Sequence, residues 1–149
     1  MKSRAIIIPV AILSSALVGC QALLDFLAPN SFTVTFVNDS DTYDVELTLA
    51  TAENENTPED VLQLLGDERN ITVGPGQTVV RVFNCDAIGA LMIETAELQS
   101  PLIQPDTESG VWRLSEDFVC GDEIVFTFTH SDVLIDFDVS EEVRTFGTP

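Results

Sequence analysis

Residues 31–49 read SFTVTFVNDSDTYDVELTL, and this stretch decides the fold class because apolar and polar residues alternate twice within it. Every second residue from Phe32 to Phe36 is apolar, and the same period of two returns in residues 43–49. Such a period places every second side chain on one face of a β-strand. The polar residues 38–42 are typical of a turn, so the stretch predicts a hairpin of two half-buried strands.

Similar short runs continue to the end of the chain. They lie at residues 70–73, 77–83, 90–98, 111–114, 123–129 and 133–139. Gly74-Pro75-Gly76 places Pro and then Gly at the centre of a type II turn. His130-Ser131-Asp132 is the expected turn of a second hairpin, between the last two runs. Strands of this length and spacing predict an all-β fold, an antiparallel β-sandwich of about seven to eight strands.

One short helix is predicted after the polar residues 51–57. Thr57 is the expected N-cap, Pro58 suits the first turn, and Gly66 is expected to end the helix. Four apolar residues give the helix a hydrophobic side: Val61, Leu62, Leu64 and Leu65. We expect this side to pack on the core as a lid or crossover.

The start of the chain has the organisation of an export signal. Lys2 and Arg4 precede a mainly apolar stretch of fourteen residues, Ala5 to Val18. That length is too short to cross a bilayer core of about 30 Å as a helix, but it fits the apolar region of a secretory signal. The stretch ends in LVGC at residues 17–20.

The LVGC motif resembles the lipobox of bacterial lipoproteins. The resemblance implies cleavage between Gly19 and Cys20, lipid on the Cys20 thiol, and anchoring of an exported protein to a bilayer. Gln21, in place of the Asp that often retains such proteins at the inner membrane, favours the outer membrane. An ordinary secretory signal with a chance cysteine, or a short membrane anchor, is the alternative.

These signals divide the chain into four parts. We expect a signal peptide at 1–19, a lipidated tether at 20–30, an acidic β-sandwich domain at 31–140 and a frayed tail at 141–149. A domain of about 110 residues can bury one sizeable core.

Two cysteines remain besides Cys20 once the signal is removed, Cys85 and Cys120. In an oxidising compartment this pair predicts a disulfide, with two buried free thiols as the alternative. Closing a loop of this length stabilises the fold by about 4 kcal/mol in the chain-entropy model. Neither cysteine has a Cys or His neighbour at ligand spacing, which disfavours a metal site.

The chain after the signal is strongly acidic. It contains all 25 acidic residues, four arginines and no lysine, an excess of 21 negative charges. This surface repels phosphates, which excludes nucleic acid as a partner. The missing lysines also exclude amine catalysis.

Calcium is the most plausible small partner, through Asp39, Asp41 and Asp44 in the polar turn. Hard oxygen ligands at this spacing suit Ca²⁺. However, the turn lacks the glycine of an EF-hand loop, and Tyr43 stands where an oxygen ligand belongs. An exposed, solvated turn is therefore the alternative.

No set of catalytic residues is recognisable in the sequence. His130 is the only histidine and is expected in an exposed turn, and neither a Gly-rich phosphate loop nor HExxH occurs. We therefore predict a non-enzymatic envelope lipoprotein, held to the bilayer through Cys20, with a structural or protein-interaction role, an envelope protein as its partner, and no cofactor or small-molecule substrate. One alternative is a calcium-binding or adhesion module. The other is a small hydrolase or its accessory domain, which needs two carboxylates across a cleft.

Overall fold

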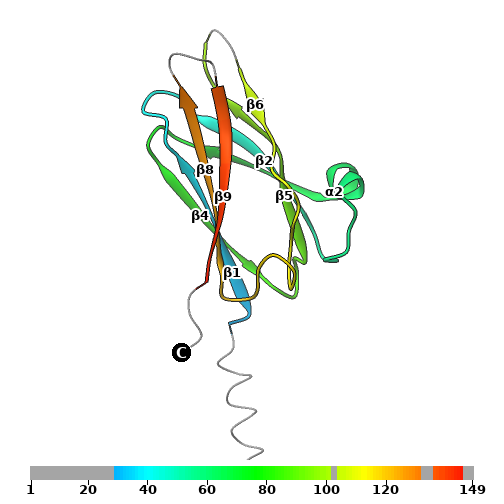
Figure 1. The fold of residues 1–149 in the computed structure, drawn as a ribbon. Coiled ribbons are helices and arrows are strands. Elements are labelled where there is room, and N and C mark those ends of the chain that lie inside the picture. Colours follow the sequence, from blue (N-terminus) through cyan, green and yellow to red (C-terminus); the bar gives the residue numbers. More distant parts are fainter. Residues whose placement is uncertain (1–28, 102–103, 132–135, 146–149) are drawn as a thin grey trace, which may run out of the picture.

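A computed structural model describes residues 29–101, 104–131 and 136–145, which form two β-sheets packed face to face (Figure 1). The first sheet has the order β4 (Thr78–Asn84), β1 (Ser31–Asn38), β8 (Glu123–Ser131), β9 (Asp136–Arg144). The second has the order β3 (Asp67–Val73), β2 (Val45–Ala52), β5 (Ala90–Leu98), β6 (Asp106–Thr107), and β7 (Trp112–Arg113) also pairs with β5. The predicted all-β sandwich is confirmed, with nine strands within the described ranges.

The core lies between the sheets and is built by the alternation seen in the sequence. The inward residues of β1 are at most 1 % exposed: Phe32, Val34 and Phe36. The inward residues of β2 are at most 3 % exposed: Val45, Leu47 and Leu49. The rings of Phe36 and Phe126 stack with centroids 5.8 Å apart. Each large apolar side chain buried in this way contributes about 1.5–3 kcal/mol.

The predicted hairpin of residues 31–49 is wrong, because its two strands belong to different sheets. β1 pairs with β4 and β8, whereas β2 pairs with β3 and β5. The segment between them therefore crosses from one sheet to the other. Alternation shows only that each strand has one buried face. Two strands can bury those faces side by side in one sheet, as in a hairpin, or opposite each other in the two sheets of a sandwich.

One strand pair departs from the predicted antiparallel arrangement. β1 and β8 run parallel, with Thr33 beside Glu123 and Val37 beside Thr127. The N-terminal strand thus lies in the middle of the first sheet, flanked by β4 and by the last hairpin of the chain (Figure 1). Pairing between segments so far apart in the chain is not encoded in local alternation.

The predicted turn at Gly74-Pro75-Gly76 is confirmed. Gly76 has a φ of 60°, as the third residue of a type II turn requires, and the N–H of Gln77 donates to the carbonyl of Gly74 at 3.0 Å. The turn carries the chain from β3 in the second sheet to β4 in the first.

The predicted helix is present as α2 (Glu59–Leu65), but it is capped and packed differently from expectation. Pro58 occupies the N-cap without a side-chain hydrogen bond, and the Thr57 hydroxyl donates instead to the carbonyl of Asn54. Only Leu62 of the helix is buried. It packs on outward-facing residues of the second sheet: Ala50, Ala90 and Met92. The remaining apolar residues of the helix face solvent.

The C-terminal region is more ordered than predicted. The β8–β9 hairpin is confirmed, but β9 continues to Arg144, so residues 141–144 are strand and not a frayed tail. Val143 packs against the core opposite Ile124, which explains the extension. His130 lies within β8 opposite Phe137, and not in the turn.

Candidate functional site

Cys85 and Cys120 form a disulfide where the N-terminal segment joins the domain. Their Cα atoms are 6.2 Å apart, closer than the roughly 9.5 Å that separates two strands on either side of a third. Cys85 follows β4 and Cys120 precedes β8, the two strands that flank β1. The bond therefore draws these segments together beside the first residue of β1. The predicted pairing is confirmed.

The chain just before β1 packs against this disulfide. The N–H of Cys85 donates to the carbonyl of Asn30 at 3.1 Å, and the N–H of Gly121 donates to that of Ser31 at 2.8 Å. Gly121 has a φ of 98°, and a Cβ on it would lie 2.7 Å from Cγ of Pro29. Cys20 itself, the expected lipid site, lies outside the described residues. Among those residues no helix is long and apolar enough to cross a membrane.

The calcium candidates lie on the crossover between β1 and β2, and the structure does not assemble them into a site. Asp39, Asp41 and Asp44 are all exposed. Within residues 29–101, 104–131 and 136–145, no group of three His, Cys, Asp or Glu side chains is placed to hold a metal ion. The calcium hypothesis therefore lacks the geometry it needs in the described part of the chain.

Two neutral side chains hold this crossover instead, and neither was predicted from the sequence. The buried amide of Asn38 donates to the carbonyls of Tyr43 (2.9 Å), Val73 (2.9 Å) and Gly74 (3.2 Å). The Ser40 hydroxyl accepts from the backbone N–H of Tyr43 at 3.0 Å. Asn38 thus joins the end of β1 to the start of β2 and the end of β3. Its position at the end of an alternating run, just before a polar turn, was the available signal.

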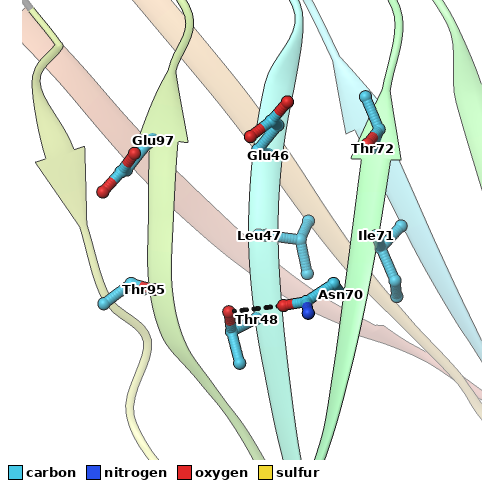
Figure 2. A pocket seen from close by; sticks show the side chains of 8 residues that line it. All are labelled: Glu46, Leu47, Thr48, Asn70, Ile71, Thr72, Thr95 and Glu97. Carbon is cyan, nitrogen blue, oxygen red and sulfur yellow. Dashed lines mark hydrogen bonds between the residues drawn. The ribbon is translucent and has the colours of Figure 1, made fainter.

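A shallow polar hollow of about 200 Å³ lies on the outer face of the second sheet (Figure 2). Its polar side chains come from β2, β3 and β5: Glu46, Thr48, Asn70, Thr72, Thr95 and Glu97. Thr48 donates to the side-chain oxygen of Asn70 at 3.0 Å. Leu62 of α2 covers the other end of this face, so the hollow is the part left open.

The hollow is acidic, but its carboxylates are not arranged for hydrolysis. Glu46 lies directly opposite Glu97, and Glu97 lies opposite Asp106, so three acids form one row across the sheet. All three are exposed. A glycoside hydrolase needs two carboxylates that face each other across a cleft, whereas these acids lie side by side on an open sheet. The row therefore resembles a solvated acidic face.

Each arginine among the described residues makes a contact within the domain. Arg69 lies over the Phe83 ring, 5.2 Å from its centroid, and Arg81 donates to the carbonyl of Val80 at 3.1 Å.

Arg113 donates to the carbonyls of Glu55 and Thr57 and so fixes the loop before α2. Arg144 pairs with the carboxylates of Glu142 and Glu123. These cations serve the fold.

Glu141 of β9 and Trp112 of β7 join the two sheets by a side-chain hydrogen bond. Partial burial of this largely exposed side chain raises the pKa of Glu141 above its usual value, and hydrogen bonds from the Trp112 side chain and the Gly110 backbone partly offset the shift. The Trp112 ring also meets Phe126 edge-on, with centroids 6.3 Å apart. The ring contact links β8 of the first sheet to β7 of the second, and the hydrogen bond between Trp112 and Glu141 links β9 to β7.

Two apolar patches interrupt the acidic surface. On α2, Leu64 is 80 % and Leu65 is 81 % exposed, and the helix projects from the body of the domain (Figure 1). On β4, Val80 is 51 % and Val82 is 68 % exposed. Exposed apolar groups that lie together mark interaction sites more often than isolated ones do.

Comparison with known proteins finds likeness to solved structures. No protein-family profile and no curated protein matches the chain. A candidate cell adhesion protein from Bacteroides uniformis matches with a TM-score of 0.43 and 14 % identity, over 80 % of this chain and 52 % of that one. A candidate cell adhesion protein from Bacteroides ovatus matches with a TM-score of 0.41 and 7 % identity, over 82 % of this chain and 46 % of that one.

A structure described as "Trapped Toxin" also matches, with a TM-score of 0.45 and 9 % identity, over 78 % of this chain and 24 % of that one. The chain thus spans about half the length of the two candidate adhesion proteins and about a quarter of the third. Scores and identities this low do not support transferring a function to this chain.

Proposed function

We propose that this chain is an exported, lipid-anchored protein of the bacterial envelope whose β-sandwich acts as a non-enzymatic interaction domain. The observation that carries the interaction role is the pair of exposed apolar patches on α2 and β4. They are exposed on a surface that otherwise carries an excess of acids. Exposed apolar side chains that lie next to one another favour contact with another molecule.

Export and anchoring are supported by the N-terminal motif and the disulfide together. A disulfide is stable in an oxidising compartment outside the cytoplasm. Its position beside Pro29 and Asn30 ties the domain firmly to the segment that leads back to Cys20. The excess of 21 negative charges also keeps the domain away from anionic lipid headgroups, as suits a body held on a tether.

The two alternatives receive less support. A calcium-binding module needs acids that converge, and Asp39, Asp41 and Asp44 do not form a group with metal-binding geometry. A hydrolase needs a shielded acid facing a second carboxylate, whereas Glu46 and Glu97 are exposed neighbours on an open sheet.

Labelling with radioactive palmitate in a bacterium that processes lipoproteins tests the anchor. The wild-type chain should incorporate label and pellet with membranes, and Cys20→Ala should lose both properties. Cys85→Ala is the matched control, because it removes a cysteine without touching the motif. Absence of label from the wild-type chain would refute the anchoring.

The interaction role is tested by placing a photo-crosslinking residue at Leu64 or Val82 in the anchored chain, with exposed Thr72 as the control position. We expect one identified envelope protein to crosslink from an apolar patch and not from Thr72. Equal crosslinking to many proteins from all three positions would contradict a specific interaction.

A further inference from the structure

Strand β4 is an edge of the first sheet, and it differs from the other described edges in being seven residues long with a single charged side chain, Arg81 (Figure 1). Natural proteins block exposed edges with charges, proline, bulges or very short strands. β9 carries acids along its length, and β3 begins with Asp67, Glu68 and Arg69. β6 and β7 have two residues each. β4 is seven residues long, reads TVVRVFN, and pairs with β1 without a register shift.

The outward backbone groups of β4 can be assigned from its pairing with β1. The N–H of Asn38 donates to the carbonyl of Gln77, and the N–H of Cys85 donates to that of Asn30. Hydrogen-bonded and non-bonded pairs alternate in an antiparallel ladder, so residues 79, 81 and 83 bond to β1. The N–H and C=O groups of Val80 and Val82 therefore face the open edge. The Arg81 guanidinium donates to the Val80 carbonyl at 3.1 Å, so an added strand would replace that hydrogen bond.

The side chains of Val80 and Val82 are also exposed. Val80 lies beside Thr35 and Val82 beside Thr33 on the outer face of the sheet. An added strand would thus gain hydrogen bonds from these residues and apolar contact with their side chains. Val82, 68 % exposed, is the more open of the two.

We propose, resting on the interaction role above, that β4 binds an extended segment of another protein as an added strand. The segment alternates β-branched apolar residues with small polar ones, and cationic residues flank it. Alternation matches Val80 and Val82 across the new pair. Flanking cations are favoured because the rest of the domain is strongly acidic, whereas β4 itself contains no acid.

A second copy of the chain fits this edge poorly. Antiparallel pairing of two β4 strands across a two-fold axis would bring the two Arg81 side chains close together. It would also join two domains that each carry a large excess of negative charge. The chemistry therefore favours a different, cationic partner.

A fluorescent peptide of sequence Lys-Lys-Thr-Val-Thr-Val-Thr-Val-Lys-Lys is a direct probe for the full chain purified in detergent. We expect saturable binding by fluorescence anisotropy, and slower hydrogen exchange at the amides of Val80 and Val82. A peptide of the same sequence, N-methylated at every valine, is the control for backbone pairing and should not bind.

Three variants locate the site. Val82→Pro removes an outward N–H without removing a bond to β1 and should weaken binding at least about fivefold. Val82→Lys keeps the backbone and should weaken binding by charge repulsion, which preserves the test if the proline variant fails to fold. The double variant Leu64→Ser, Leu65→Ser alters the other apolar patch and should bind as the wild type does.

Other outcomes overturn the proposal. No saturation at millimolar peptide, equal binding of the N-methylated peptide, or protection that maps to α2 or β9 would each exclude strand addition at β4. Slowed exchange at Val80 and Val82 that depends on the concentration of the chain alone would assign the edge to a second copy. If the chain incorporates palmitate and crosslinks through Leu64 but does not bind the peptide, strand addition at β4 is refuted and the proposed function still stands.

Discussion

The two ends of β1 are held by different chemistry. At its start, a disulfide joins the segments that follow β4 and precede β8. At its end, the amide of Asn38 donates to three carbonyls on the neighbouring loops and strands. The disulfide forms only where thiols are oxidised, whereas the hydrogen bonds of Asn38 form in any compartment where the chain folds. The comparison shows that one strand can depend on its environment at one end and not at the other.

Removing the disulfide should have the largest effect. The double variant Cys85→Ala, Cys120→Ala should lower the free energy of unfolding by about 3–4 kcal/mol, because the unfolded chain loses the constraint of a closed loop. Urea unfolding of the full chain measures the change, and reductant should reproduce it in the wild type. If the domain is equally stable with and without reductant, the start of β1 does not depend on an oxidising environment.

Asn38→Ala should lower stability by about 2–3 kcal/mol, because it leaves the carbonyls it served without a donor in a buried position. The loss should be the same with and without reductant, which sets it apart from the disulfide. Exposed Asp39→Ala is the adjacent control and should change stability by less than about 0.5 kcal/mol. A loss for Asn38→Ala that depends on reductant would mean that the two ends are coupled.

Gly121→Ala tests the packing beside the disulfide and should cost about 1–2 kcal/mol. Alanine at this position would have to adopt a φ of 98°, which is strained for a residue with a side chain, and its Cβ would lie too close to Pro29. Gly110→Ala is the control, since a Cβ there meets nothing within 4 Å. Thermal unfolding of both variants measures the difference. Equal melting temperatures would show that the start of β1 is held by the disulfide alone.

Glu141→Gln should have the smallest effect, and it touches neither end of β1. The raised pKa means that folded Glu141 holds its proton better than the unfolded chain does. Its contribution to stability is therefore greatest below the ordinary glutamate pKa and is lost as the pH rises through the folded pKa. The variant should be more stable at neutral pH by less than about 0.5 kcal/mol, since solvent screens this exposed side chain. The gain should vanish in acid, as melting curves across pH would reveal.

The sequence predicted the strands, the core and the disulfide, because each depends on local chemistry. Alternation identified the buried residues of β1 and β2, and setting aside Cys20 as the predicted lipid site left Cys85 and Cys120 as the predicted pair. The sheet to which each strand belongs was not predictable in the same way. β1 and β2 look like a hairpin in the sequence, and only packing across the core separates them.

The features of the candidate sites were predicted less well, for a related reason. Asn38 looked like one polar turn residue among several, since its three acceptors lie on β3 and on the loops around it. Leu64 and Leu65 were expected to pack on the core, but the seven-residue helix rests on the outer face of a sheet and buries a single position, Leu62. The open edge of β4 depends on strand order, which alternation does not encode.

The disulfide beside Pro29 has a mechanical consequence. A pull on the chain before β1, directed along that strand, loads the bonds to β4 and to β8 at the same time. Both rows of bonds must then shear together, because they lie across the direction of force and cannot open one by one. The bridge between Cys85 and Cys120 stops the two flanking strands from spreading as the load rises. The junction with the N-terminal segment is thus built to resist tension.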